Sequence, residues 1–147
     1  MQTAPPAVDA LLTALMTVGR LMRQRQPEDQ LDTGTFWLLK TVCHDGPLRI
    51  TDLATVTHLD TSTVSRHVSQ LERSGMVART RDPADGRAQL VGITTTGHTV
   101  IDQALQRRRD LLESILSGWA PDDMAEFERL LAKFVADINF QLPKDRT

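Results

Sequence analysis

Residues 61–74 space hydroxyl and guanidinium side chains at intervals that would bring them together on a helix. One face of that helix would carry no acid and five residues of these two kinds: Ser62, Ser65, Arg66, Ser69 and Arg73. Val64, Val68 and Leu71 fall on the opposite face at core spacing. Arginine can fork onto guanine or phosphate, and small hydroxyls let a helix backbone approach a duplex closely. The pattern predicts a DNA-recognition helix, although an ordinary solvated amphipathic helix could carry the same residues.

The start of this helix adds three more hydroxyl groups, from Thr61, Ser62 and Thr63. Asp60 before them is a good N-cap, and Gly75 suits the position after the last turn. Because free backbone N–H groups and the helix dipole favour an anion at an N-terminus, we expect this end to approach DNA phosphates.

The stretch "RTRDPADGRAQL", residues 79–90, has turn chemistry between two apolar edges. It predicts a hairpin with strands at 76–81 and 88–94 and a tip at Asp85–Gly86. Arg79 and Arg81 would share one strand face as possible phosphate contacts, and Arg87 would follow the tip. A solvated hairpin explains the stretch alone, whereas a finger that touches a polyanion explains it beside a recognition helix.

The elements that must position these residues follow from apolar periodicity and breakers. Helices are predicted at about 6–26, from Thr33 to the "DGP" break at 45–47, within 49–59, at 61–74, at about 96–117 and at about 121–141. The fold class is therefore mainly α with a small β-hairpin. The terminal helices carry apolar stripes that a chain of 147 residues can hardly bury alone, which suggests a partner subunit.

Composition narrows the function class. The net charge is −2, yet residues 61–90 hold five arginines and only three acids, so a basic island lies in an acidic chain. We find no signal peptide and no apolar stretch long enough for a membrane span, and we expect a soluble, cytoplasmic protein. No catalytic or nucleotide-binding motif is present, which argues against an enzyme, and we expect no cofactor.

Residues 48–97 resemble the winged helix–turn–helix of the MarR family of bacterial regulators. The matching segments are "ITDLA", "LDTSTVSRHVSQLERSGMV" and "RTRDPADGRAQLVGITTTG". The family's wing signature falls on Asp85, Arg87 and the Ile93–Thr94 pair. Gly86 departs from the pattern, because many relatives carry a basic residue there. The flanking helices match in order and length, so the resemblance covers nearly the whole chain.

The resemblance implies a winged helix–turn–helix flanked by N- and C-terminal dimerisation helices. Residues 1–32 and 96–147 would form the dimerisation lobe and 33–95 the DNA-binding lobe. The resemblance further implies a homodimer on a pseudo-palindromic duplex, and a repressor is the expected role. Arg87 would enter the minor groove, and Asp85 would orient Arg87 or tie the wing to the body.

Family members often bind small aromatic or anionic ligands in a crevice between the two lobes. By resemblance, six residues of the first two helices are candidates for that crevice: Met16, Arg20, Arg23, Phe36, Trp37 and His44. A core role for the aromatic residues and a solvated role for the arginines is the alternative for each.

Two further alternatives stay open. Cys43, the single cysteine, could act as a redox switch, but its place late in an apolar helix favours a buried structural role. The four scattered histidines do not suggest a metal site. A non-enzymatic protein-interaction module on the same fold is the other alternative, although its binding face would be more apolar than the Ser/Arg face at 62–73.

Overall fold

The computed structural model describes residues 6–24 and 28–141. Six helices and one hairpin follow one another in this part of the chain: α1 (Pro6–Arg23), α2 (Thr33–Asp45), α3 (Ile50–Thr57), α4 (Thr61–Arg73), β1 (Val77–Asp82), β2 (Asp85–Ile93), α5 (Thr95–Leu116) and α6 (Pro121–Gln141). The predicted class, mainly helical with a small hairpin, is confirmed. The predicted helix at 6–26 ends at Arg23, and its last positions, including Arg25, lie outside the described residues.

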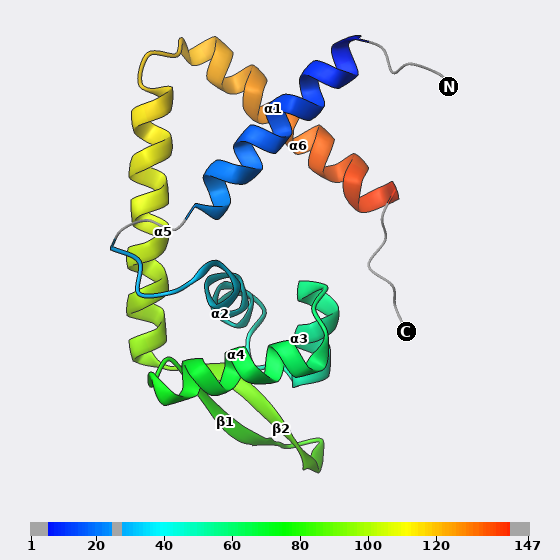
Figure 1. The fold of residues 1–147 in the computed structure, drawn as a ribbon, viewed down its shortest axis with the longest axis vertical. Helices are drawn as coiled ribbons and strands as arrows, with labels where there is room; N and C mark the ends of the chain where they lie inside the picture. The colour runs from blue at the N-terminus through cyan, green and yellow to red at the C-terminus, as the bar shows by residue number, and fades with distance from the viewer. Residues whose placement is uncertain (1–5, 25–27, 142–147) are drawn as a thin grey trace.

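Helix α5 runs along one side of the molecule and connects its two ends (Figure 1). At one end of it lie α2, α3, α4 and the β1–β2 hairpin, and at the other end lie α1 and α6. We call these two ends the winged lobe and the terminal-helix lobe. The arrangement separates the basic island of the sequence from the apolar stripes of the first and last helices.

Side-chain caps mark the start of α2, α4 and α5. Asp32 accepts a bond from the backbone N–H of Thr35 at 2.9 Å, and Asp60 does the same for Thr63 at 2.7 Å. Thr94 accepts from the N–H of Gly97 at the start of α5, at 3.1 Å. Each cap satisfies one of the N–H groups that have no partner within the helix, which stabilises the start of these three helices.

One apolar core holds the winged lobe together. Val64, Val68 and Leu71 of α4 are buried, as their spacing predicts, and they share a cluster with side chains of α2, α3, the hairpin and the first turns of α5. The last buried residue of this core is Ala104. Helix α6 has no buried residue, so the apolar side chains of the terminal-helix lobe remain exposed.

The hairpin is antiparallel, with Arg79 opposite Val91, and Leu48 forms an isolated bridge to Val91 on its other side. The prediction of a tip at Asp85–Gly86 is wrong. The turn lies at Pro83–Ala84, because the Asp82 carboxylate accepts the N–H of Ala84 at 2.9 Å and the ring of Pro83 favours a turn. Gly86 instead lies in β2 without a positive φ.

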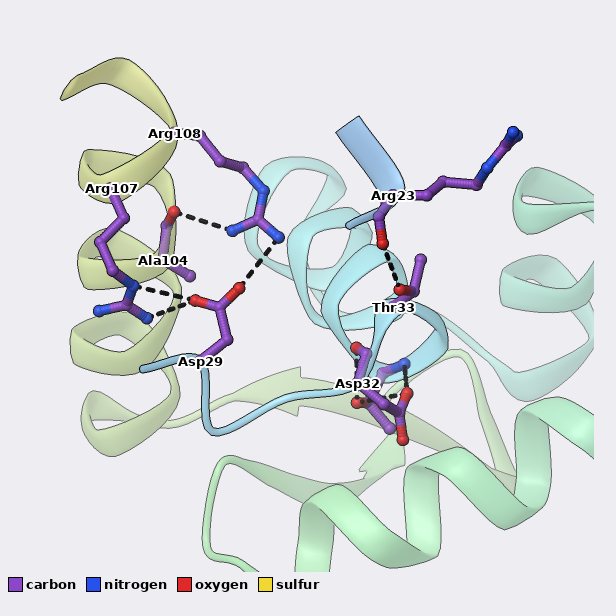
Figure 2. Close-up of polar contacts among 8 residues, drawn as sticks. Arg23, Asp29, Asp32, Thr33, Ala104, Arg107 and Arg108 are labelled. Atoms are coloured by element: carbon purple, nitrogen blue, oxygen red, sulfur yellow. Dashed lines mark hydrogen bonds and ion pairs between the residues drawn. The ribbon is translucent and has the colours of Figure 1, made fainter. Parts of the chain in front are cut away.

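A buried carboxylate ties the α1–α2 connection to α5 (Figure 2). The side chain of Asp29 is 3% exposed and accepts bonds from Arg107 Nε at 3.0 Å and Arg108 Nη2 at 3.2 Å. The Arg108 guanidinium also lies 3.8 Å from the ring centroid of Phe36, in the core. This cluster lies on α5 just beyond Ala104, where the apolar core ends.

Gly97 should be a strict requirement of this fold. A Cβ at that position would lie 2.8 Å from Ile93 Cγ1 and closer still to the carbonyl oxygen of Met76. We expect Gly97→Ala to lower the free energy of unfolding by about 1–3 kcal/mol through overpacking, although alanine is the better helix former. Urea denaturation of the purified protein measures this.

Gly118→Ala is the matched control, because a Cβ there meets nothing within 4 Å. It should change the free energy of unfolding by less than about 0.5 kcal/mol. Equal stability of the two variants would show that α5 does not pack on the Met76 carbonyl as described.

Candidate nucleic-acid interface

The α4 face predicted from spacing is only partly open to solvent. Ser62, Arg66 and Arg73 are exposed, whereas Ser65 and Ser69 are half-buried. Arg73 turns back along its own helix, with Nε 3.4 Å from the carbonyl oxygen of Ser69. Of the two arginines on α4, Arg66 is thus the one whose guanidinium makes no bond within the described part of the chain.

The N-terminus of α4 is already occupied by a carboxylate of the chain itself. Asp60 accepts bonds from Ser62 Oγ at 2.6 Å, from the N–H of Thr63 at 2.7 Å and from Thr63 Oγ1 at 3.0 Å. The bond from Ser62, followed by those from Thr63, lowers the pKa of Asp60 to about 2. A phosphate at this helix end would be repelled by the charged carboxylate of Asp60. The expectation of an anion site at Thr61–Thr63 did not take this repulsion into account.

Arg79 links the hairpin to α4. Its Nε lies 3.0 Å from Glu72 Oε2, and its Nη2 donates to Ser69 Oγ at 3.3 Å. Its side chain is 24% exposed. The predicted phosphate contact Arg79 and the predicted recognition residue Ser69 are therefore bonded to each other in the protein without DNA.

A second ion pair attaches the hairpin to α3. Arg49 donates through Nε to Asp82 Oδ2 at 2.8 Å, and its Nη2 lies 2.6 Å from the same oxygen. Asp85, the residue expected to orient Arg87 or to tie the wing to the body, accepts the backbone N–H of Arg87 at 3.1 Å. In the structure the wing acid that forms an ion pair with the body is thus Asp82, and Asp85 bonds within the wing.

Sequence reasoning missed Arg49, although a signal for it was present. Arg49 is the N-cap of α3 and makes no side-chain cap bond. A cation at a helix N-terminus is disfavoured by the helix dipole. An arginine in that position therefore suggests a carboxylate partner elsewhere in the fold, but its identity depends on how the hairpin packs.

Four arginines surround a hollow of about 570 Å³ between the start of α3 and the hairpin. They are Arg49, Arg79, Arg81 and Arg87. The first two are paired with acids, whereas Arg81 and Arg87 have no ion-pair partner among the described residues. Alternation along the strands places Arg79, Arg81 and Arg87 on one face of the hairpin, as predicted for the first two.

The result is a surface on which three guanidinium groups have no bonded partner among the described residues, while two of the nearby acids are paired within the chain. Arg66, Arg81 and Arg87 are exposed, while Asp82 and Glu72 are each paired with another arginine. Free guanidinium groups on a helix and an adjacent hairpin can bond to phosphates or to base edges in a groove. The arrangement has the chemistry to bind a duplex.

The six expected ligand residues do not form one site. Phe36 is 2% exposed and belongs to the core. Arg20 and Arg23 line a shallow hollow with Gln24 at the end of α1. Three others are exposed and lie outside that hollow: Met16, Trp37 and His44.

Cys43 is half-buried against the core, not fully buried as expected. Its Sγ lies 3.7 Å from Nδ1 of His98 at the start of α5. Within residues 6–24 and 28–141, no three His, Cys, Asp or Glu side chains gather as a metal site would require. The same part of the chain contains no helix that is both long enough and apolar enough to cross a membrane.

The low pKa of the Asp60 cap predicts that the free energy of unfolding falls at acid pH. Because the folded-state pKa of about 2 lies below the ordinary 3.8, the unfolded chain binds more protons at Asp60 in this range. The stabilisation is complete above pH 3.8 and is lost as the pH falls towards 2. Asp60→Asn keeps the cap oxygen but cannot titrate. Urea unfolding in that pH range should show a steeper loss for the wild type, and parallel curves would contradict the role of Asp60.

The chain matches the MarR family model over residues 34–88. It is 33% identical over 103 residues to the HTH-type transcriptional regulator YxaD of Bacillus subtilis, covering 70% of this chain and 72% of that protein.

Solved structures give the same fold. A MarR family protein from Bacillus stearothermophilus superposes with a TM-score of 0.84 at 23% identity, over 94% of this chain and 99% of that one. Bordetella bronchiseptica BpsR, whose DNA binding is regulated by 6-hydroxynicotinic acid, superposes with a TM-score of 0.64 at 23% identity, over 89% and 99%. With the identity to YxaD, these matches place the chain in the MarR family, whose curated relatives here are HTH-type transcriptional regulators.

Proposed function

We propose that this protein is a homodimeric regulator that binds double-stranded DNA through α4 and the hairpin, and that it represses transcription until a small ligand releases it. One observation carries the proposal. Arg66, Arg81 and Arg87 present exposed guanidinium groups that no described residue pairs with, whereas Glu72 and Asp82 beside them are paired within the chain. Local neutralisation of phosphates, not total charge, sets affinity for DNA, so a net charge of −2 is no obstacle.

In this proposal α4 lies in the major groove and the hairpin is the wing. The α4 contacts are drawn from Thr61, Ser62, Thr63, Ser65, Arg66, Ser69 and Arg73. Arg66 is the direct contact best supported by exposure. Ser62 and Thr63 would first have to give up the hydroxyl bonds that they donate to Asp60, whereas Ser69 accepts its bond from Arg79 and can still donate its hydroxyl.

The wing contacts are Arg79, Arg81 and Arg87. Arg87 would enter the minor groove, where narrow A·T-rich segments attract arginine, and Asp85 would hold the backbone of Arg87. Arg79 would contribute by joining the wing to α4 through Glu72 and Ser69.

The terminal-helix lobe supports a homodimer. Large apolar side chains on α1 are exposed, including Leu12 at 56% and Met16 at 66%. Those on α6 are exposed too, including Phe134 at 37% and Val135 at 48%. A second copy of these helices would cover them. Residues 1–32 and 96–147 would then form the dimer lobe, with 33–95 as the DNA-binding lobe.

A dimer would present two α4 helices to one duplex. Recognition helices in successive major grooves are about 34–36 Å apart, so the operator should be a pseudo-palindrome. Ligand binding between the lobes would change that separation. The Arg20–Arg23 hollow favours an anionic ligand, and BpsR, regulated by 6-hydroxynicotinic acid, suggests an aromatic acid as the first probe. Such a regulator would act in the cytoplasm, at the nucleoid when bound.

Duplex binding as a function of salt tests the DNA proposal. A duplex selected from a random pool should bind with an affinity that falls steeply with salt, because each neutralised phosphate adds about 0.9 to the slope. Arg87→Ala should weaken binding at least fivefold, or about 1 kcal/mol, without changing the thermal unfolding midpoint. Fluorescence anisotropy measures the affinities.

Arg129→Ala is the matched control. It removes the same charge from an exposed arginine of α6, which is paired with Glu126 in the terminal-helix lobe. Its affinity should equal that of the wild type. No selectable duplex, or a flat salt dependence, would reject DNA binding, and an Arg87→Ala affinity within twofold of wild type would reject the wing contact.

Phe134→Asp tests the dimer. A charge placed among the exposed apolar residues of α6 should abolish the interface, while the core from Leu31 to Ala104 stays intact. Analytical ultracentrifugation should show a wild-type dimer and a variant monomer with an unchanged helical circular-dichroism spectrum. Lys133→Asp on the same helix, where the lysine pairs with Asp137 at the surface, should stay dimeric. A monomeric wild type at micromolar concentration would overturn the proposal.

A further inference from the structure

The outer half of the hairpin has one polar attachment to the rest of the described chain. The inner half is held at Arg79 by Glu72 and Ser69, and at Val91 by the backbone bridge to Leu48. The outer half extends beyond these points, from Arg81 to Gln89. Within residues 6–24 and 28–141, it is bonded to the rest of the chain through the pair of Arg49 and Asp82. The outer half carries both Arg81 and Arg87.

The Asp82 carboxylate divides its two oxygens between two tasks. Oδ2 receives Arg49 Nε at 2.8 Å and Nη2 at 2.6 Å, and Oδ1 accepts the N–H of Ala84 in the turn at 2.9 Å. Asp82 is 9% exposed, which is low for an acid in a hairpin. One carboxylate therefore connects the start of α3 directly to the turn of the hairpin.

The pair is a poor candidate for a stabilising interaction of the fold. The Arg49 side chain is 38% exposed, and ion pairs of that kind contribute little to the free energy of unfolding. An isolated two-stranded hairpin is marginally stable, however, and its free end samples many orientations. What the pair restricts is the direction of that free end relative to α3 and α4.

We propose that Arg49 is a positioning residue for DNA binding, which acts through Asp82 to hold the outer half of the hairpin in a fixed orientation relative to α4. This inference rests on the proposed function. Without the pair, the hairpin would have to be ordered when DNA binds, and that ordering reduces affinity. Arg49 itself does not need to touch DNA, because Nε and Nη2 are already bonded to Asp82.

Asp82→Asn separates positioning from charge. Removing an acid beside the DNA should raise affinity if charge alone matters. The asparagine oxygen can still accept the Ala84 N–H, but the ion pair with Arg49 is lost. We expect affinity to fall about tenfold, within the range of coupled neighbouring residues. Asp52→Asn is the matched control, because this exposed α3 acid is also electrostatically close to Arg49 but makes no hydrogen bond or ion pair among the described residues.

Arg49→Ala should also lower affinity for DNA about tenfold. The double variant Arg49→Ala/Asp82→Asn should bind DNA as tightly as whichever single variant has the lower affinity. The salt slope should stay at the wild-type value in all three. Additive losses, or a slope reduced by about 0.9 in Arg49→Ala, would show that Arg49 contacts a phosphate directly and would overturn the proposal. A rise in affinity in Asp82→Asn would overturn it as well.

A measurement without DNA distinguishes this inference from the proposed function. Trypsin cleavage after Arg87, followed by mass spectrometry, should be faster in Arg49→Ala and Asp82→Asn than in the wild type and Asp52→Asn. The thermal unfolding midpoint should be nearly the same in all four. If Arg49→Ala and Asp82→Asn bind DNA normally and are cleaved no faster than the wild type, the positioning role of the Arg49–Asp82 pair is rejected and the proposed function stands. If the two variants are cleaved faster but the wild-type protein binds no duplex, the proposed function is rejected, and with it the role of Arg49 in DNA binding. The attachment of the hairpin by the Arg49–Asp82 pair would still be supported.

Discussion

The reach of the apolar core is the constraint on which the rest of this structure depends. Every buried apolar side chain among the described residues lies between Leu31 and Ala104. A core of this extent is enough to fix α2, α3, α4, the hairpin and the first turns of α5 against one another. It leaves the apolar faces of α1 and α6 exposed, which a soluble monomer would rarely tolerate. One end of the molecule thus has its own apolar core, and the apolar faces at the other end are those that a second copy covers in the proposed dimer.

The Asp29 cluster lies at the boundary between these two ends. A carboxylate that is 3% exposed needs strong partners, and Arg107 and Arg108 supply them from the turn of α5 that follows Ala104. Arg108 also covers Phe36, so the cluster is continuous with the core. The entry into α2 is therefore fixed against α5 at this place.

Charge pairing sorts the arginines of the winged lobe into two kinds. Arg49 and Arg79 hold the hairpin against α3 and α4 through Asp82 and Glu72. Arg66, Arg81 and Arg87 remain available to an external anion. Without Glu72 and Asp82, the hairpin would lose its side-chain ion pairs and keep the backbone bridge between Leu48 and Val91. Glu72 and Asp82 therefore help to build the surface proposed to bind DNA, although each carries a negative charge.

The sequence by itself determined the helices, their caps and the inward face of α4, because apolar spacing and cap chemistry are local properties. It also determined the family. It could not locate the hairpin turn, since Asp82 competes with the "DG" pair for that role and the outcome depends on Asp82 being bonded on both oxygens. Only the tertiary structure decided which arginines are free, because Arg49 and Asp82 are distant in the chain and nothing local joins them.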